Sequence, residues 1–450
     1  MANRYRMNRR QFTTAAAAAG AAASATFAVP NIIKAQDAVT LRYFLWDTNQ
    51  QPAYQECADK FTEANPNITI QIEQLVWDDY WTALQTGMVS GDVPDVFTNH
   101  LSRYPELAGR GQLVDIQPLV ERDGVDVDQY EGELAELWSR DGARYGLPKD
   151  WDTIAVVYNK EMLDAAGIDP AIFDEWTWNP DDGGTFHETI AALTVDEAGN
   201  TGADEGFDKS KVTQYGWGHE LGDAYGQTAW SHFAASLGWN FIDAPWTPPF
   251  HYDDERVIKT IQYLADLKNV HGFSVPEDQV STMNMEAVFA ARTAAIIPVG
   301  SWLINWIADN VDFEFGFGRL PSGPEGRKSM FNGLADSIWT GSEHQEEAWE
   351  WVKYLGSAEA QEIIGSWGVV FPAIPSAAEA AQAAWDEKGL DVSPYLDQAQ
   401  EEDGTFLFPI VDQASEFVAI VTPVFQSVAL GDAQAADVFP GMNDEVNALY

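Results

Sequence analysis

Cysteine is nearly absent from this chain, which has one, Cys57, among 450 residues. No disulfide can form within the chain, so a folded protein of this size must be held together by its hydrophobic core. Cys57 falls in the amphipathic pattern of Tyr54, Ala58 and Phe61, which is typical of a helix with one buried face. We therefore expect a buried, inert thiol and not a lipid-modified cysteine.

Basic residues are also scarce, because 25 Lys and Arg stand against 70 Asp and Glu. The first 35 residues hold five of the basic residues and no acidic one, so residues 36–450 carry a formal charge of −50. This charge argues against nucleic acid or an anionic membrane as a partner. It also disfavours an anionic ligand, which would need Arg, Lys or helix N-termini. An acidic surface fits a salt-rich habitat, where ions screen self-repulsion.

The sequence lacks the short motifs of common enzymes. His187-Glu188 and His219-Glu220 are not followed by the second histidine of a zinc protease, and there is neither a GxSxG elbow nor a P-loop. Residues 196–204 are acidic without the EF-hand spacing, so we expect turns there and not a calcium site. We predict no catalysis, no cofactor and no metal. A secreted glycoside hydrolase is the main rival, since it too would use tryptophans and paired carboxylates.

The N-terminal segment has the layout of an export signal. Residues 1–36 have five basic residues and no acidic one, and residues 11–33 are uncharged. Arg9 and Arg10 precede Phe12, which resembles a twin-arginine signal. We expect residues 1–35 to be this signal, with cleavage near Ala35, and the protein to act in the periplasm or outside the cell. The alanine-rich core is only weakly apolar, so a permanent membrane anchor is the weaker alternative.

Strand and helix patterns alternate after this segment. Strands are expected at residues 39–45, 68–72 and 94–97, with helices at residues 52–65 and 79–89. This order predicts a parallel sheet with helices on both faces, and ligands bind beyond the carboxyl ends of such strands. The residues at or beside these ends are Trp46, Asp47, Trp77, Asp78, Asn99 and His100.

Residues 145–160, YGLPKDWDTIAVVYNK, join a turn-rich loop to an apolar run that is typical of a buried strand. Asn159 is expected to cap the helix that follows and Gly167 to end it. One strand–helix lobe precedes this stretch and another follows it. Asp150 and Trp151 would therefore lie at the seam between two lobes, where small-molecule sites are common.

The second half of the chain adds further candidates beside glycines. A strand at residues 212–217 ends in Trp217, and a helix is expected at residues 227–237. A strand at residues 294–299 runs into Gly300-Ser301-Trp302, and Asn332-Gly333 indicates a close backbone approach. Residues 173–208 have weak periodicity and are expected to form loops around a short helix near residues 187–193.

The 18 tryptophans indicate the kind of ligand. The axial hydrogens of a sugar stack on an aromatic ring, while its hydroxyls need donors and acceptors. Tryptophans mixed with Asp, Asn and His at strand ends supply both. The predicted ligand-binding residues are Trp46, Asp47, Trp77, Asp78, Asn99, His100, Asp150, Trp151, Trp217, Trp302, Asn332, Gly333 and Trp367.

Several segments together resemble the maltose-binding-like extracellular solute-binding proteins of ABC-type sugar importers. They are residues 61–72 (FTEANPNITIQI), 91–97 (GDVPDVF), 111–119 (GQLVDIQPL), 146–163, 289–302 (FAARTAAIIPVGSW) and 332–371. The chain departs from the family pattern at Ala295-Ile296, where the family has Ala-Met, and by a long insertion at residues 174–208.

The resemblance implies an α/β, two-lobe periplasmic-binding-protein fold of type II character, with parallel-sheet lobes joined by hinge strands. It implies a first lobe of residues 37–149 and 321–356 and a second of residues 150–320 and 357–450. Trp302 and Trp367 match positions where the family places stacking aromatics. The implied function is capture of a neutral sugar or oligosaccharide by a monomer, for delivery to ABC permease subunits. A binder of a polyol phosphate or a peptide is the alternative.

Overall fold

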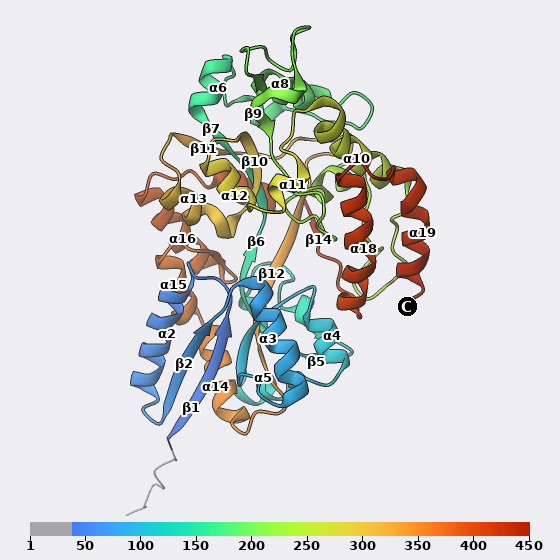
Figure 1. Ribbon diagram of the computed structural model, residues 1–450. Helices are drawn as coiled ribbons and strands as arrows, with labels where there is room; N and C mark the ends of the chain where they lie inside the picture. The colour runs from blue at the N-terminus through green and yellow to red at the C-terminus, as the bar shows by residue number, and fades with distance from the viewer. Residues whose placement is uncertain (1–37) are drawn as a thin grey trace, which may run out of the picture. The chain divides into compact units, whose positions relative to one another are not determined.

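Two β-sheets, each flanked by helices, organise the part of the chain that the computed structural model describes, residues 38–450 (Figure 1). The predicted export signal at residues 1–35 lies outside these described residues. Across residues 38–450, no helix combines the length and the apolar character needed to span a membrane.

The first sheet has seven strands, with the order β13-β6-β12-β3-β1-β2 and with β14 beside β12. Their bounds are β1 Val39–Leu45, β2 Ile68–Gln74, β3 Val96–His100, β6 Leu147–Asp152, β12 Ser329–Ile338, β13 Phe371–Pro372 and β14 Thr405–Leu407. The strands β1, β2 and β3 are parallel, as predicted. The sheet as a whole is mixed, because β12 returns from the second sheet and runs antiparallel to both β3 and β6.

The second sheet has five strands in the order β11-β7-β10-β9-β8. Their bounds are β7 Ile154–Asn159, β8 Val195–Asp196, β9 Val212–Trp217, β10 Ala294–Gly300 and β11 Phe315–Gly318. In this sheet only β9 and β10 are parallel. The expectation of parallel-sheet lobes is therefore wrong for the second sheet, and in the first sheet it holds only for β1, β2 and β3. A short antiparallel pair, β4 Ser139–Arg140 and β5 Ala143–Arg144, stands apart from both sheets.

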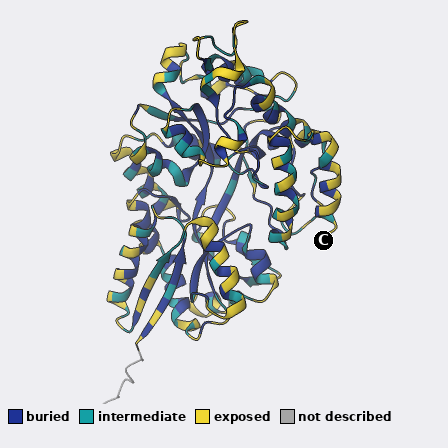
Figure 2. Ribbon diagram, viewed as in Figure 1, coloured by how far each residue is buried: buried dark blue, intermediate teal, exposed yellow. Residues whose placement is uncertain are grey.

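Helices bury one face against these sheets and expose the other (Figure 2). Those associated with the first sheet are α2 Gln51–Ala64, α3 Trp77–Ser90, α4 Tyr104–Gly109, α5 Gln117–Asp123, α14 Gln345–Leu355, α15 Ala358–Ser366 and α16 Pro375–Glu387. The remainder are α6 Lys160–Ala166, α7 Ile172–Glu175, α8 Gly184–Leu193, α9 Ser231–Ala235, α10 Glu255–Asp266, α11 Glu277–Val280, α12 Met285–Ala290, α13 Ile304–Asn310, α17 Ser393–Gln400, α18 Ala414–Ala429 and α19 Ala435–Asn447.

Local sequence signals account for several element ends. Asn159 caps α6, as predicted, by accepting a hydrogen bond from the backbone N–H of Met162 at 3.1 Å. Gly167 ends that helix with a φ of 67°, a left-handed conformation that favours glycine. Cys57 is fully buried on α2, as predicted, and burial raises the pKa of its thiol to about 12.

The chain passes from the first sheet to the second at Thr153, the single residue between β6 and β7. The backbone N–H of Ile154 donates to Ser329 Oγ at 2.8 Å, so this crossing contacts the start of β12, which carries the return. The expected lobe boundary at residue 356, which assigns residues 357–450 to the second lobe, is wrong for residues 358–372. The helix α15 packs on α2, and β13 pairs with β6, which keeps residues 358–372 with the first sheet.

Candidate ligand-binding site

A cavity of about 940 Å³ lies where strand ends and loops of the two sheets meet. The first sheet and its helices contribute Trp46, Asp47, Trp77, Asp78, His100, Asp150, Trp151, Asp152 and Asn332 to its lining. The remainder of the chain contributes Asp223, Tyr225, Gln227, Asn284, Glu286, Ser301, Trp302, Trp306, Phe408, Val418 and Thr422. Residues of both lobes therefore line one cavity.

An aromatic cluster forms one side of the cavity. The ring of Trp46 meets Trp77 edge-on at a centroid distance of 5.0 Å, and Trp77 in turn meets His100 at 5.5 Å. Trp81 packs behind both tryptophans from α3. Trp77 keeps 39% of its surface exposed, so its ring offers apolar area that the fold itself does not cover.

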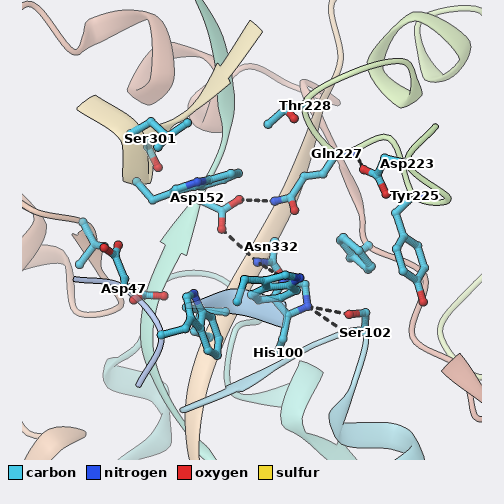
Figure 3. Close-up of a pocket in the computed structure, with 18 of the residues that line it drawn as sticks. Asp47, His100, Ser102, Asp152, Asp223, Tyr225, Gln227, Thr228, Ser301 and Asn332 are labelled. Carbon is cyan, nitrogen blue, oxygen red and sulfur yellow. Dashed lines mark hydrogen bonds between the residues drawn. The ribbon is translucent and has the colours of Figure 1, made fainter. Parts of the chain in front are cut away.

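A chain of hydrogen bonds crosses the cavity floor from one lobe to the other (Figure 3). Gln227 Nε2 donates to Asp152 Oδ1 at 2.8 Å, and Asn332 Nδ2 donates to Asp152 Oδ2 at 3.0 Å. Asn332 Nδ2 also lies 3.1 Å from His100 Nε2, and His100 Nδ1 accepts from the backbone N–H of Ser102 at 3.1 Å. These contacts fix the direction of each polar group before any ligand arrives.

Burial shapes the charge of these groups. It lowers the pKa of His100 to about 3, with Arg103 adding to the effect, so the imidazole is neutral near neutral pH. Desolvation raises the pKa of Asp150 to about 7, partly offset by Lys149 and reinforced by Asp336. Burial also raises the pKa of Asp152. The floor therefore combines a neutral imidazole with carboxyl groups that hold protons unusually well.

Trp302 follows β10 on the opposite side of the cavity and is only partly buried. A Cβ added at Gly300 would come within 2.0 Å of the Trp302 ring. Any larger residue at position 300 would clash with the indole, which lies against the end of its own strand. This contact fixes the orientation of the ring while part of its surface remains uncovered.

Nine of the thirteen predicted site residues line the cavity. They are Trp46, Asp47, Trp77, Asp78, His100, Asp150, Trp151, Trp302 and Asn332. Trp151 is 5% exposed and stacks on Phe371 at 4.7 Å, so it contributes an edge of the wall and not an open face.

The other four predicted residues lie elsewhere. Trp217 is fully buried in the core and contacts Phe186 at a centroid distance of 5.1 Å. Trp367 lies on the surface at the end of α15, 41% exposed, and its indole N–H donates to Glu56 at 3.0 Å.

Asn99 and Gly333 have structural roles in the first sheet. The Asn99 side chain is fully buried and donates to Ser337 Oγ at 3.1 Å. A Cβ at Gly333 would approach Leu134 to 2.6 Å, so this glycine admits a core leucine and not a ligand.

The loop between β9 and α9 supplies site residues that the sequence analysis missed. A helix over residues 227–237 is wrong, because only Ser231–Ala235 are helical. The irregular stretch before it carries Asp223, Tyr225 and Gln227 into the cavity. The strand-end rule could have predicted these residues, because this loop also follows the carboxyl end of a strand, β9.

Metal-ligating geometry does not occur within residues 38–450, where no group of three or more His, Cys, Asp or Glu side chains could hold an ion. The carboxylate of Asp196 stabilises the acidic turn in which it lies. It accepts the backbone N–H groups of Ala198, Asn200 and Asp208 and so closes the loop upon itself.

Two lobes, connected by crossing strands and lining one cavity, define a two-lobe solute-binding protein. The sequence agrees with this class, because residues 46–362 match the family model of bacterial extracellular solute-binding proteins. The chain belongs to that family.

Named relatives are similar to this chain in sequence or in structure. A putative binding protein of Brucella abortus is 22% identical over 88% of this chain and 90% of its own length. The multiple sugar-binding protein of Streptococcus mutans is 24% identical over 73% of each chain. The crystal structure of Mycobacterium tuberculosis UspC, at 26% identity, matches with a TM-score of 0.70 over 92% of this chain and all of that one. The substrate-binding protein Lmo0181 of Listeria monocytogenes, 18% identical, gives 0.77 over 92% and 99%.

Proposed function

We propose that this protein captures a saccharide between its two lobes and delivers it to the permease of an ABC-type importer. The observation that carries the proposal is a single cavity in which exposed tryptophan surface and fixed polar groups come from both lobes. Its volume of about 940 Å³ is near the upper end of ordinary small-molecule sites, which leaves room for more than one sugar ring.

The chemistry of the lining fits a sugar. Trp77 and Trp302 offer apolar surface for the faces of the ring, while Asp150, Asp152 and Asn332 offer partners for its hydroxyls. These side chains are the ligand contacts we propose.

The names of the relatives point the same way. One binds multiple sugars in Streptococcus mutans, and the Listeria structure was solved with cycloalternan. A further structural neighbour, UgpB of Mycobacterium tuberculosis, was solved with glycerophosphocholine, a phosphate ester. Arg103 is the only Lys or Arg in the lining of this cavity, so a phosphate would find few partners here.

The remaining parts of the proposal follow from this role. The protein would act outside the cytoplasm as a monomer and return its sugar chemically unchanged. The lobes would close about Thr153 and the start of β12. The ligand would favour the closed state because it binds that state more tightly than the open one. The permease would then recognise the closed, ligand-bound conformation.

Thermal-shift screening of residues 36–450 against mono-, di- and oligosaccharides, polyols, phosphate esters and amino acids tests the proposal. A bound saccharide should raise the melting temperature, because it binds only the native state. Chromatography of the sugar after incubation with excess protein should recover it intact. Preferential stabilisation by a non-saccharide, or turnover of a sugar, would contradict the proposal.

A further inference from the structure

The N-terminus of α18 contacts the first lobe directly, outside the cavity (Figure 1). This helix packs on α10 and α19 of the second lobe. Its own N-cap residue, Gln413, has a φ of 61° and makes no side-chain capping hydrogen bond. The cap comes instead from Glu106 on α4, whose Oε2 accepts from the backbone N–H of Ser415 at 3.0 Å and from its hydroxyl at 2.9 Å. A carboxylate of one lobe therefore caps a helix of the other.

The surroundings of Glu106 favour this contact. The side chain is 8% exposed, and a carboxylate is stabilised by the partial positive charge at a helix N-terminus. Glu416, in the first turn of α18, brings a second negative charge close by. Arg110 lies between the two carboxylates, at 2.7 Å from Glu106 and 3.6 Å from Glu416. This cation offsets the repulsion between the two glutamates.

A second contact between the lobes lies beside the first. Arg140 on β4 pairs with Asp412 at 2.8 Å, and its guanidinium lies 4.2 Å from the centroid of the Trp246 ring. Asp412 comes just before α18, and the backbone N–H of Trp246 donates to Ile410 O at 2.9 Å in the same segment. We call these two contacts together the inter-lobe latch, which consists of Glu106, Arg110 and Arg140 on the first lobe and Trp246, Asp412, Ser415 and Glu416 on the second.

The latch lies one helical turn from the cavity on both lobes. Arg103, at the start of α4, lines the cavity and stands three residues before Glu106. Val418 lines the cavity from α18 and stands three residues after Ser415. Residues three or four apart lie on the same face of a helix. A motion that breaks the contact between Glu106 and Ser415 therefore also draws the two cavity walls apart.

We propose that the inter-lobe latch holds the two lobes together around the cavity, with Glu106 as the residue that positions α18 for ligand capture. The latch stabilises the closed arrangement without a ligand, so a ligand that enters has less closure to bring about through its own contacts. The inference rests on the lobe closure of the proposed function and not on the saccharide. Loss of the latch leaves both lobes folded and shifts the ligand-free protein toward a wider cleft.

The reactivity of a thiol placed in the cavity wall measures this opening without a ligand. The native Cys57 is fully buried, so Thr422→Cys, which lies on α18 in the cavity lining, supplies the reacting thiol. In this background Glu106→Gln should raise the rate of reaction with Ellman's reagent about 2- to 30-fold, the range that corresponds to loss of a helix cap. The radius of gyration of the ligand-free protein should also rise in small-angle scattering.

Two further variants separate opening of the latch from general loosening. Glu255→Gln removes a carboxylate from the first turn of α10, together with its ion pair to Lys259 at 2.7 Å. This pair lies within one lobe, so the thiol rate should stay unchanged. Asp412→Asn removes the pair with Arg140 from a partly exposed position and should raise the rate. It carries the test if Glu106→Gln does not fold.

The outcomes decide the inference separately from the proposed function. A higher rate in a folded latch variant, with no change in Glu255→Gln, supports the latch. An unchanged rate and radius in the folded latch variants overturn it, and so does an equal rise in Glu255→Gln. All of these measurements are made without ligand, so their failure leaves saccharide capture standing. A thermal-shift screen that finds only non-saccharide ligands would overturn the proposed function and leave the latch intact.

Discussion

Replacing Trp302 by alanine should weaken ligand binding without unfolding the protein. The indole lies against Gly300 on one side and faces the cavity on the other, and it is only partly buried. Its removal therefore takes away ligand contact while leaving β10, which is buried throughout, in place.

The expected magnitude follows from the surface that the ligand would cover. A tryptophan side chain buries about 150–250 Å² when fully enclosed, and a sugar ring could cover at most roughly a third of that, because the protein already covers the rest of the Trp302 ring. At about 25 cal/mol per Å², the lost contact is worth about 1–2 kcal/mol, which corresponds to a Kd weaker by about 5- to 30-fold. The ligand-free protein should lose less than the about 3–5 kcal/mol typical of a buried Trp→Ala change.

Titration calorimetry with the ligand found by screening, and a ligand-free melt on the same preparation, measure both quantities. Trp367→Ala is the matched control, because that ring is exposed and lies outside the cavity, so its Kd should not change. Trp217→Ala provides the opposite control, a large loss of stability from the core. The reasoning is refuted if Trp302→Ala lowers the ligand-free melting temperature as much as Trp217→Ala does while binding is unaffected.

Three further expectations concern the whole molecule. Saturating ligand should reduce the radius of gyration in small-angle scattering, since contacts come from both lobes; an unchanged radius with confirmed binding would contradict closure. Asp150, with a raised pKa of about 7, holds a proton that the unfolded chain releases, so its contribution to stability falls as pH rises from about 4 to about 7. The melting temperature of Asp150→Asn, measured relative to that of the parent protein, should therefore rise as the pH increases across this window. Parallel curves of melting temperature against pH would refute the assignment. The melting temperature of the parent protein should rise between low and molar salt, because screening relieves repulsion at a net charge of −50; circular dichroism melts that show no rise would argue against a salt-adapted surface.

Local patterns were enough to predict elements whose boundaries depend on local chemistry. The strand expected at residues 39–45 has those bounds, since its apolar alternation and the following turn are both readable. Asn159 and Gly167 were predictable for the same reason, because a cap and a stop depend on one side chain and one φ angle. The strand-end rule also identified Trp46 and His100 as cavity residues.

The wrong assignments arose where tertiary contacts decide. Adjacent residues at a strand end point to opposite faces, so the pattern could not show that His100 lines the cavity while Asn99 contacts Ser337. Trp217 has the same sequence context as Trp302, and only the packing of Phe186 against it reveals a core residue. The loop that carries Tyr225 has no periodicity, so its course depends on contacts that the sequence does not display.

The cavity-lining side chains of β6 lie within three residues of Thr153, where the chain changes sheets. Any rotation of the lobes about this point moves Asp150 and Asp152 little, because displacement grows with distance from the axis. Trp77 and Trp302 belong to elements on opposite sides of the crossing and would travel further. Substitutions near Thr153 should then change how fast a solute is first captured, whereas substitutions of the two tryptophans should change how long it stays.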